Sequence, residues 1–174
     1  ECPLQNQSLS HGDGESRFGM AKRTFPKPVN ISAQILLDRE RCILCARCTR
    51  FSEQISGDPF IELVERGALQ QVGIYEKDPY DSYFSGNVIQ ICPVGALTDR
   101  HFGHHPWEMD TTETICGFCD VGCTINIESN KGIVRRSTNL WERGVNHGYV
   151  CEKGKWGHER IQSSDRLTNP SSRD

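Results

Sequence analysis

The sequence predicts a small α+β protein made of two cysteine-centred domains. Its 174 residues suit two small globular units better than one large catalytic domain. Short β-prone runs and one short helical run lie around grouped cysteines. The nine cysteines form two quartets and a remainder. The quartets are Cys42, Cys45, Cys48 and Cys92, then Cys116, Cys119, Cys123 and Cys151, and the remainder is Cys2.

The first domain is predicted around the first quartet. Ile35 to Asp38 is a short apolar run that leads into the cysteine loop, and Thr49 to Ser56 has the composition of a short helix that Gly57 ends. Phe60 to Val64 and Gln70 to Tyr75 are β-prone, which predicts a hairpin. These elements are too short for a large core, so we expect bound metal to supply much of the stability.

The second domain is predicted around the second quartet. Thr124 to Glu128 alternates as a strand does, Asn130 to Gly132 predicts a turn because glycine accepts a positive φ, and Ile133 to Arg136 resumes as a strand. Lys153 follows the last cysteine by two residues. The positive charge of Lys153 either offsets the negative charge of a metal centre or belongs to a side chain that lies in solvent. The sequence leaves both interpretations open.

Composition narrows the range of functions. The formal net charge is -3 and the charges are mixed along the chain, so we expect no nucleic-acid partner. No apolar run approaches the roughly 20 residues of a membrane-spanning helix, so we expect a soluble chain without a span. The chain begins at Glu1 without an initiator Met or a signal peptide. We therefore expect a fragment of a longer protein.

Three chemistries can use cysteines in such groups. Disulfides are disfavoured because cysteines two or three residues apart bridge each other poorly. Zinc is the stronger alternative, since four thiolates form a closed structural site. Zinc sites usually divide their ligands two and two, whereas CxxCxxC places three thiolates on one loop and takes the fourth from elsewhere. The first quartet follows this second pattern and favours a 4Fe-4S cluster.

The segment around Cys92 supports a ferredoxin-like first domain. Pro93 follows Cys92, and Cys-Pro closes the cluster loops of ferredoxins. A two-cluster ferredoxin would carry a second CxxCxxC just before this cysteine, but residues 83–90 contain none. We therefore expect a single cluster in this domain. The second quartet has the different spacing CxxCxxxC with a distant fourth cysteine, which indicates a different type of domain.

Several motifs together resemble one family. They are Cys2 to Gln5, Gly14 to Phe18, Arg23 to Pro28, Asp38 to Phe51 and the Cys92 segment. In this order they resemble the large iron-sulfur subunit (the G subunit) of bacterial NADH-quinone oxidoreductase, respiratory complex I. The resemblance covers most of the chain, and the single-cluster ferredoxin domain is also typical of that subunit.

The resemblance implies a role for each cysteine. Cys42, Cys45, Cys48 and Cys92 would hold a 4Fe-4S cluster on the path from flavin to quinone. Cys116, Cys119, Cys123 and Cys151 would hold an additional 4Fe-4S cluster, off the main path, in a β-rich domain of the molybdopterin-oxidoreductase type. Cys2 would be the last ligand of a cluster held by one histidine and three cysteines, whose other ligands precede residue 1.

The resemblance also implies the setting of the chain. Two 4Fe-4S clusters are expected in this part, and further 4Fe-4S and 2Fe-2S clusters in the full-length protein. The partners would be the flavin-binding and other iron-sulfur subunits in the peripheral arm of complex I, on the cytoplasmic side of the membrane. The implied ranges are 1–34 for the remnant of the upstream cluster segment and a linker, 35–104 for the ferredoxin-like domain, 105–165 for the second domain and 166–174 for a linker to a missing domain.

Two other functions remain as alternatives. An NAD-linked formate dehydrogenase or hydrogenase shares these modules but commonly keeps the second CxxCxxC motif. A zinc-stapled structural module is the alternative from another class. The sequence predicts no catalytic residue. We expect His101, His104 and His105 to lie in a solvated connector, and His147 and His158 to lie at the surface, with donation to cluster sulfurs as the alternative. We expect Trp107, Trp141 and Trp156 to pack around the second cluster rather than to relay electrons.

Overall fold

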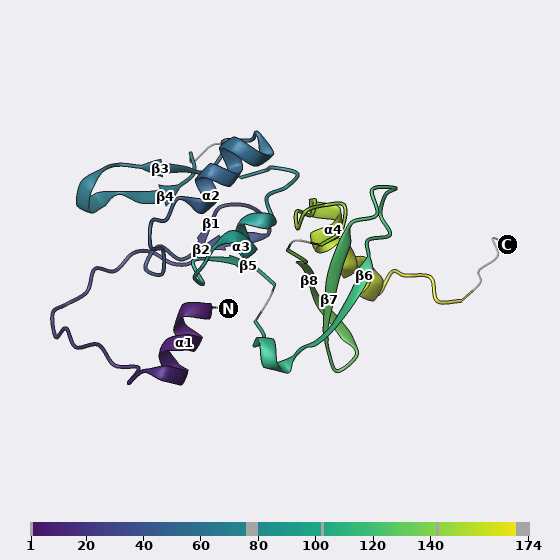
Figure 1. Ribbon diagram of the computed structural model, residues 1–174, viewed down its shortest axis with the longest axis horizontal. Coiled ribbons are helices and arrows are strands. Elements are labelled where there is room, and N and C mark those ends of the chain that lie inside the picture. The colour runs from purple at the N-terminus through teal and green to yellow at the C-terminus, as the bar shows by residue number, and fades with distance from the viewer. Residues whose placement is uncertain (1, 76–79, 102, 142, 170–174) are drawn as a thin grey trace. The chain divides into compact units, whose positions relative to one another are not determined.

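The computed structural model of the chain consists of two compact units (Figure 1). It describes residues 2–75, 80–101, 103–141 and 143–169. The first unit is Glu1–Pro106 and the second is Trp107–Asp174. Each unit is described by itself below.

The first unit is built on a small antiparallel sheet. Its strands are β1 (Val29–Asn30), β2 (Ile35–Leu37) and β5 (Leu97–Asp99), in the order β1-β2-β5. Ile35 pairs with Asp99 and Leu37 with Leu97. Ile35, Leu37 and Leu97 are all buried, so this sheet supplies the core from which the first cysteine loop leaves and to which the chain returns after Cys92.

Helical segments carry the two ends of the first quartet. Helix α2 (Arg47–Arg50) continues directly into a π-helical turn, Phe51–Ser56, which ends at Gly57 in the left-handed region with φ 73°. Helix α3 (Asn87–Ile91) ends at Cys92, whose backbone N–H donates to the carbonyl of Val88 at 3.0 Å. Cys48 thus lies in α2, and Cys92 lies at the C-terminal end of α3.

A hairpin completes this part of the unit. Strands β3 (Glu62–Val64) and β4 (Gln71–Gly73) pair antiparallel and are joined through a 3-10 turn at Gly67–Leu69. The two strands are the paired arrows at the upper edge of the unit in Figure 1. Val72 of β4 is buried, so the hairpin contributes an apolar side chain to the interior.

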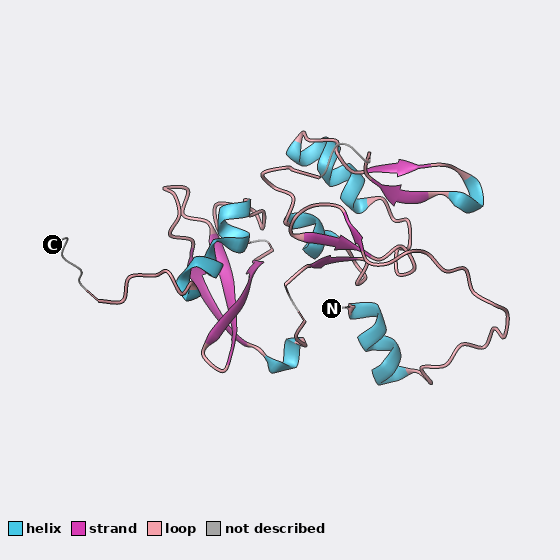
Figure 2. Ribbon diagram, turned by 180° about the vertical axis from the view of Figure 1, so that it is seen from behind, coloured by secondary structure: helices cyan, strands magenta, loops and turns pink. Residues whose placement is uncertain are grey.

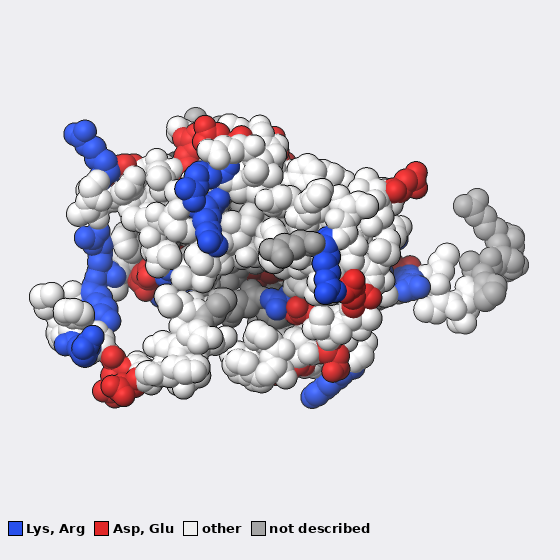
Figure 3. Space-filling model, in the orientation of Figure 1, with Lys and Arg blue, Asp and Glu red and all other residues white. Residues whose placement is uncertain are grey.

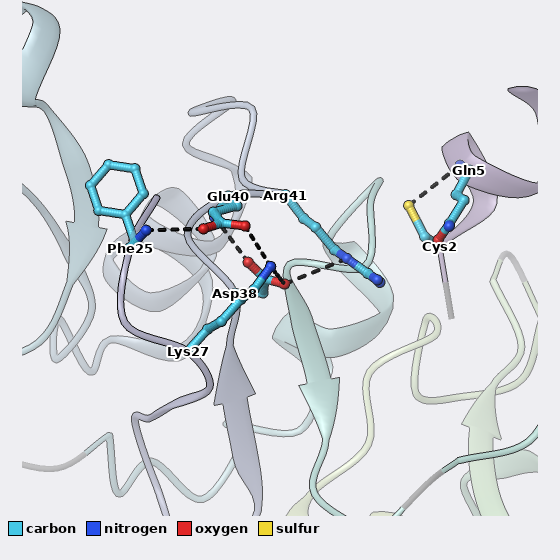
Figure 4. Close-up of polar contacts among 7 residues, drawn as sticks. All are labelled: Cys2, Gln5, Phe25, Lys27, Asp38, Glu40 and Arg41. Atoms are coloured by element: carbon cyan, nitrogen blue, oxygen red, sulfur yellow. Dashed lines mark hydrogen bonds and ion pairs between the residues drawn. The ribbon is translucent and has the colours of Figure 1, made fainter. Parts of the chain in front are cut away.

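The N-terminal part of the unit consists of helix α1 (Pro3–His11) and an extended connector that polar contacts fix to the cysteine loop. Lys27 Nζ lies 2.5 Å from Glu40 Oε2 and 3.7 Å from Asp38 Oδ2. The backbone N–H of Phe25 donates to Glu40 at 3.0 Å, and Arg41 reaches Asp38 at 3.5 Å (Figure 4). These contacts hold the connector beside the residues that precede Cys42.

The second unit is a three-stranded meander capped by a short helix (Figure 2). Strands β6 (Asp110–Ile115), β7 (Thr124–Asn130) and β8 (Ile133–Asn139) are antiparallel in chain order. The turn Lys131-Gly132 joins β7 to β8, with φ of 52° and 77°. Helix α4 (Glu152–Trp156) and a following 3-10 turn, Gly157–Gln162, come after Cys151, and a further 3-10 turn, Pro106–Glu108, precedes β6.

A partly buried ion pair supports the hairpin of the second unit. Arg136 Nε on β8 donates to Glu128 Oε2 on β7 at 2.6 Å, and Thr138 Oγ1 donates to Oε1 of the same carboxylate at 3.2 Å. Burial raises the pKa of Glu128 and lowers the pKa of Arg136 to about 10. Each charge is therefore costly by itself, and the pairing compensates the loss of water around both. Lys155 of α4 is also buried, and its charge acts on Glu128.

The expected elements are confirmed in outline. The run at 35–38 is strand β2, the helix at 49–56 begins two residues earlier and becomes π-helical, and both hairpins form with their turns where expected. Helices α1, α3 and α4 and strands β1, β5 and β6 were not predicted. The domain ranges stay predictions, and residues 170–174 of the expected linker lie outside the described residues.

The charged side chains at the surface are mixed in sign, as the composition predicts. On the face drawn in Figure 3, acidic and basic side chains are interspersed among uncharged ones. Within the described ranges, no helix combines the length and the apolar character that a bilayer crossing requires.

Candidate metal centres

The first quartet lines one pocket in the first unit. Cys42, Cys45, Cys48 and Cys92 all contribute to its wall. The remaining lining side chains are Leu37, Ile43, Ala46, Arg47, Val72, Val94, Ala96 and Leu97. These come from the sheet, the hairpin and the two cysteine segments, and all but Arg47 are apolar. Four thiols that face a shared apolar space suit a metal-sulfur centre, whose stability and potential depend on keeping water away.

The loop that carries three of these cysteines has an unusual backbone. Leu44 and Ala46 adopt positive φ angles of 54° and 57°. The left-handed region costs roughly 1 to 2 kcal/mol for a residue with a side chain, and such strain gathers at functional sites. A loop that must wrap a bound group explains why two non-glycine residues keep this conformation between the cysteines.

Burial and nearby backbone amides act on these thiols in opposite directions. The nearby backbone N–H groups of Leu44 and Thr49 act to lower the pKa of Cys42 and of Cys48, respectively. Burial raises the pKa of Cys42 and raises that of Cys48 to about 12, and the neighbouring cysteines add to both increases. The thiolates therefore repel one another in this pocket unless a cationic group binds among them. Metal binding would remove the protons and supply the missing positive charge.

The second quartet also gathers in one place. Burial raises the pKa of Cys123, and the charges of Cys116, Cys119 and Cys151 raise it further, so all four thiols lie within electrostatic reach. Cys116 follows β6, Cys123 precedes β7 and Cys151 precedes α4. The N–H of Cys116 donates to the carbonyl of Cys123 at 2.8 Å, which closes the short loop between them. This is the arrangement that the spacing CxxCxxxC predicts.

The packing around the second quartet is tight. Cys116 belongs to a buried cluster with Ile125 and Val150, against which Phe118 and Cys123 pack. Gly154 of α4 approaches so closely that an added Cβ would lie 3.5 Å from the sulfur of Cys116. On the other side, the side chain of Asn146 accepts from the N–H of Thr124 at 3.0 Å and donates to the carbonyl of Tyr149 at 3.0 Å. These contacts fix the segment that leads to Cys151.

Cys2 is buried and already serves a structural purpose. It is the N-cap of α1, where its sulfur accepts the N–H of Gln5 at 3.4 Å (Figure 4). Although burial acts to raise it, the pKa of Cys2 is held below its usual value by the backbone N–H groups of Gly95, Gln5 and Leu4 and by the charge of Arg41. Because Gly95 follows Cys92 by three residues, Cys2 touches the loop that closes the first quartet. Its assignment as a ligand of an upstream cluster stays a prediction.

The remaining candidate residues divide between surface and interior. His101, His105 and His147 are exposed and His104 is partly buried. The expectation of a surface His158 is wrong, because this residue is buried and its Nδ1 lies 3.1 Å from the carbonyl oxygen of Lys155. Lys153 is exposed, whereas Lys155, which the sequence did not single out, is buried. Its burial follows from its place on the inner side of α4.

The tryptophan prediction is only partly right. Trp156 is buried in α4 as expected. Trp141 is 45% exposed and packs edge-on against Tyr149 at 5.8 Å between ring centroids. Trp107 is 70% exposed, so its expected packing around the second quartet is wrong. Trp107 lies in the turn Pro106–Glu108, ahead of a strand whose residues are all exposed.

The donor set of each quartet, four cysteine thiols, suits a 4Fe-4S cluster. Among the described residues, no group of three or more His, Cys, Asp and Glu side chains has the arrangement that could hold a metal ion. Ligands of a single zinc ion converge within about 2.3 Å of one point. Thiolates around a metal-sulfur cube stand further apart, because the cube itself lies between them.

Comparisons with known proteins agree with iron-sulfur chemistry at these cysteines. Residues 32–98 match the family described as NADH-quinone oxidoreductase subunit 3, ferredoxin-like domain. Residues 109–163 match the molybdopterin oxidoreductase Fe4S4 domain. The two matches follow each other in the order that the sequence predicts and contain one quartet each.

Proteins that align with nearly the whole chain are also named as subunits of NADH-quinone oxidoreductase. The chain is 55% identical over 172 residues to the G subunit of NADH-quinone oxidoreductase from Streptomyces coelicolor, covering 98% of this chain and 20% of that protein. It is 54% identical over 176 residues to the G subunit from Mycobacterium bovis, covering 100% and 22%. It is 35% identical over 184 residues to NADH-quinone oxidoreductase subunit 3 of Thermus thermophilus, covering 97% and 23%.

The chain spans about a fifth of the length of these relatives. The alignments with these relatives extend along nearly all of its residues, and the two domain matches cover residues 32–98 and 109–163. The chain thus belongs to the family of the G subunit of NADH-quinone oxidoreductase, of which it represents a region with 4Fe-4S domains.

Proposed function

We propose that this chain is an electron-relay part of NADH-quinone oxidoreductase and holds two 4Fe-4S clusters. The observation that carries the proposal is the first pocket, where four cysteines from a strained loop and from the end of α3 share one apolar space. Cys42, Cys45, Cys48 and Cys92 would be the ligands of the first cluster. When bound, such a cluster takes up and gives up a single electron.

The residues around the first quartet would tune and protect this exchange. The backbone N–H groups of Leu44 and Thr49 act to lower the pKa of Cys42 and Cys48 against the effect of burial, and they would stabilise added negative charge on the sulfurs. Leu37, Val72 and Leu97 limit the access of water. Both effects would change the free energy of the reduced cluster. The protein would therefore set the reduction potential of the cluster without any catalytic side chain.

The second quartet would hold the other 4Fe-4S cluster through Cys116, Cys119, Cys123 and Cys151. We propose that it lies off the main electron path, as a centre that mainly stabilises its own domain. Cys2 would be a ligand of a third cluster, completed by a His and two Cys upstream in the full-length protein. Further 4Fe-4S and 2Fe-2S clusters would lie in that longer chain.

The names of the relatives suggest the partners and the location. The flavin-binding and other iron-sulfur subunits of complex I would bind this chain in the peripheral arm, on the cytoplasmic side of the membrane. The reaction of the whole complex would be NADH oxidation coupled to quinone reduction and cation translocation.

The relay role has a direct kinetic test in the assembled complex that contains this chain. After mixing with NADH, freeze-quenched samples should show the first centre reduced within one turnover, and added quinone should reoxidise it. Electron paramagnetic resonance follows both steps, and a sample without NADH is the control. If the first centre stays oxidised while the complex turns over, the relay role is wrong.

A further inference from the structure

The loop between the first two cysteines of the second quartet carries one large side chain, that of Phe118. Phe118 is partly buried and packs against the buried cluster that contains Cys116. Its ring also contacts the segment after α4, because an added Cβ at Gly157 would lie 3.0 Å or less from three of the ring carbons. The Phe118 side chain thus contacts both the core of the unit and the 3-10 turn Gly157–Gln162.

The rest of this loop has little packing of its own. Cys119 is exposed. Gly117 is also exposed, and an added Cβ there would meet no atom within 4 Å. Phe118 lies between these two residues in the chain. The position of the loop 116–119 therefore depends on what holds the Phe118 ring.

Arg160 of the 3-10 turn lies over this ring. The guanidinium carbon Cζ of Arg160 is 4.6 Å from the centroid of the Phe118 ring. A cation at this distance over an aromatic face is attracted by the negative charge of the π system. Arg160 is exposed, so this contact forms without the cost of burying a charge.

The turn that carries Arg160 is fixed at both ends. It follows helix α4 directly, and α4 begins immediately after Cys151. At the other end, Gln162 Nε2 donates to the carbonyl of Val134 on β8 at 2.8 Å. One continuous segment thus connects the fourth cysteine of the quartet to the ring on the loop that carries the first two.

We propose that Arg160 is a positioning residue of the second centre, and that it holds the loop 116–119 in place through the ring of Phe118. The inference rests on the proposed ligand roles of Cys116 and Cys119. Because these two cysteines flank Phe118, a contact that fixes the ring also fixes the loop on which both sulfurs lie. Groups that orient metal ligands in this way affect both the binding and the properties of the centre. Arg160 thereby slows the loss of iron from the second centre and keeps one arrangement of its thiolates.

Arg160→Gln tests the inference in the full chain purified anaerobically. Loss of the cation–π contact should raise the rate at which a chelator removes the second centre by about two- to fivefold. The electron paramagnetic resonance line shape of that centre should change, because its ligands are no longer held in one arrangement. Arg160→Lys keeps a cation and should restore both properties toward those of the wild type.

Arg135→Gln is the matched control for the change in charge. Arg135 is also exposed and lies on β8 in the same unit. This variant should leave the second centre unchanged, and the first centre should keep its signal in every variant. Equal rates and line shapes for Arg160→Gln and Arg135→Gln would contradict the positioning role.

A double-mutant cycle with Phe118→Leu shows whether Arg160 acts through the ring. Phe118→Leu keeps an apolar side chain but removes the aromatic face, so Arg160→Gln should have no further effect on iron loss in that background. Additive effects of the two substitutions would overturn the proposal. If Phe118→Leu does not retain its iron, Arg160→Lys decides, because lysine restores the wild-type properties only if a cation holds the ring. A wild-type chain without iron would contradict the proposed function, and the inference with it.

Discussion

Replacing Cys92 by alanine should abolish the first centre and leave the second intact. Cys92 is the only ligand of its quartet that comes from outside the loop 42–48, and it closes the pocket from the end of α3. Its loss leaves three thiols and an open wall, so iron and sulfide should fall to about half of the wild-type content. Anaerobic iron analysis and electron paramagnetic resonance of the reduced protein measure both effects.

Cys2→Ala is the matched control for this variant. Cys2 is also buried and contacts the same loop through Gly95, but it belongs to neither quartet. Its replacement should weaken the cap of α1, by about 1 kcal/mol, and retain both signals. Loss of both centres in Cys92→Ala, or retention of both, would show that the cysteines are paired with the wrong partners.

Gly154→Ala should selectively disturb the second centre. An added Cβ would lie 2.4 Å from Val150 Cγ1, and Val150 is 2% exposed, so neither group can move aside freely. Overpacking of this kind costs about 1 to 3 kcal/mol. Because Val150 directly precedes Cys151, relief of this clash must displace the start of helix α4 and Cys151 with it. The second signal should weaken while the first stays.

Gly117→Ala provides the comparison within the same unit. Gly117 lies between Cys116 and Cys119, but an added Cβ there meets no atom within 4 Å, and its φ lies outside the left-handed region. This variant should keep both centres. Equal iron content and equal thermal stability for Gly154→Ala and wild type would contradict the close contact between α4 and the second quartet.

The grouping of the cysteines can be predicted from the sequence because its determinants are largely local. CxxCxxC and CxxCxxxC fix which thiols lie on one loop, and the turn at Lys131-Gly132 returns the chain toward Cys151. The distant fourth cysteine of each quartet follows from the requirement for four ligands. The hairpin β3–β4 was predicted from its β-prone runs, but its role was not. Only the structure shows that Val72 lines the first pocket.

Other features depend on tertiary contacts. Every residue of β6 is exposed, so its sequence has no apolar face that would predict a strand, and pairing with β7 alone specifies it. Helix α1 is polar and lacks apolar periodicity, and its cap is a cysteine rather than a common capping residue.

The central claim is that both quartets bind iron-sulfur clusters and not zinc. Metal and acid-labile sulfide analysis of the anaerobically purified chain tests it most directly. Two 4Fe-4S clusters require roughly eight iron and roughly eight sulfide per chain, without stoichiometric zinc. About two zinc ions per chain, with neither iron nor sulfide, would contradict the account and indicate a zinc-stapled structural module.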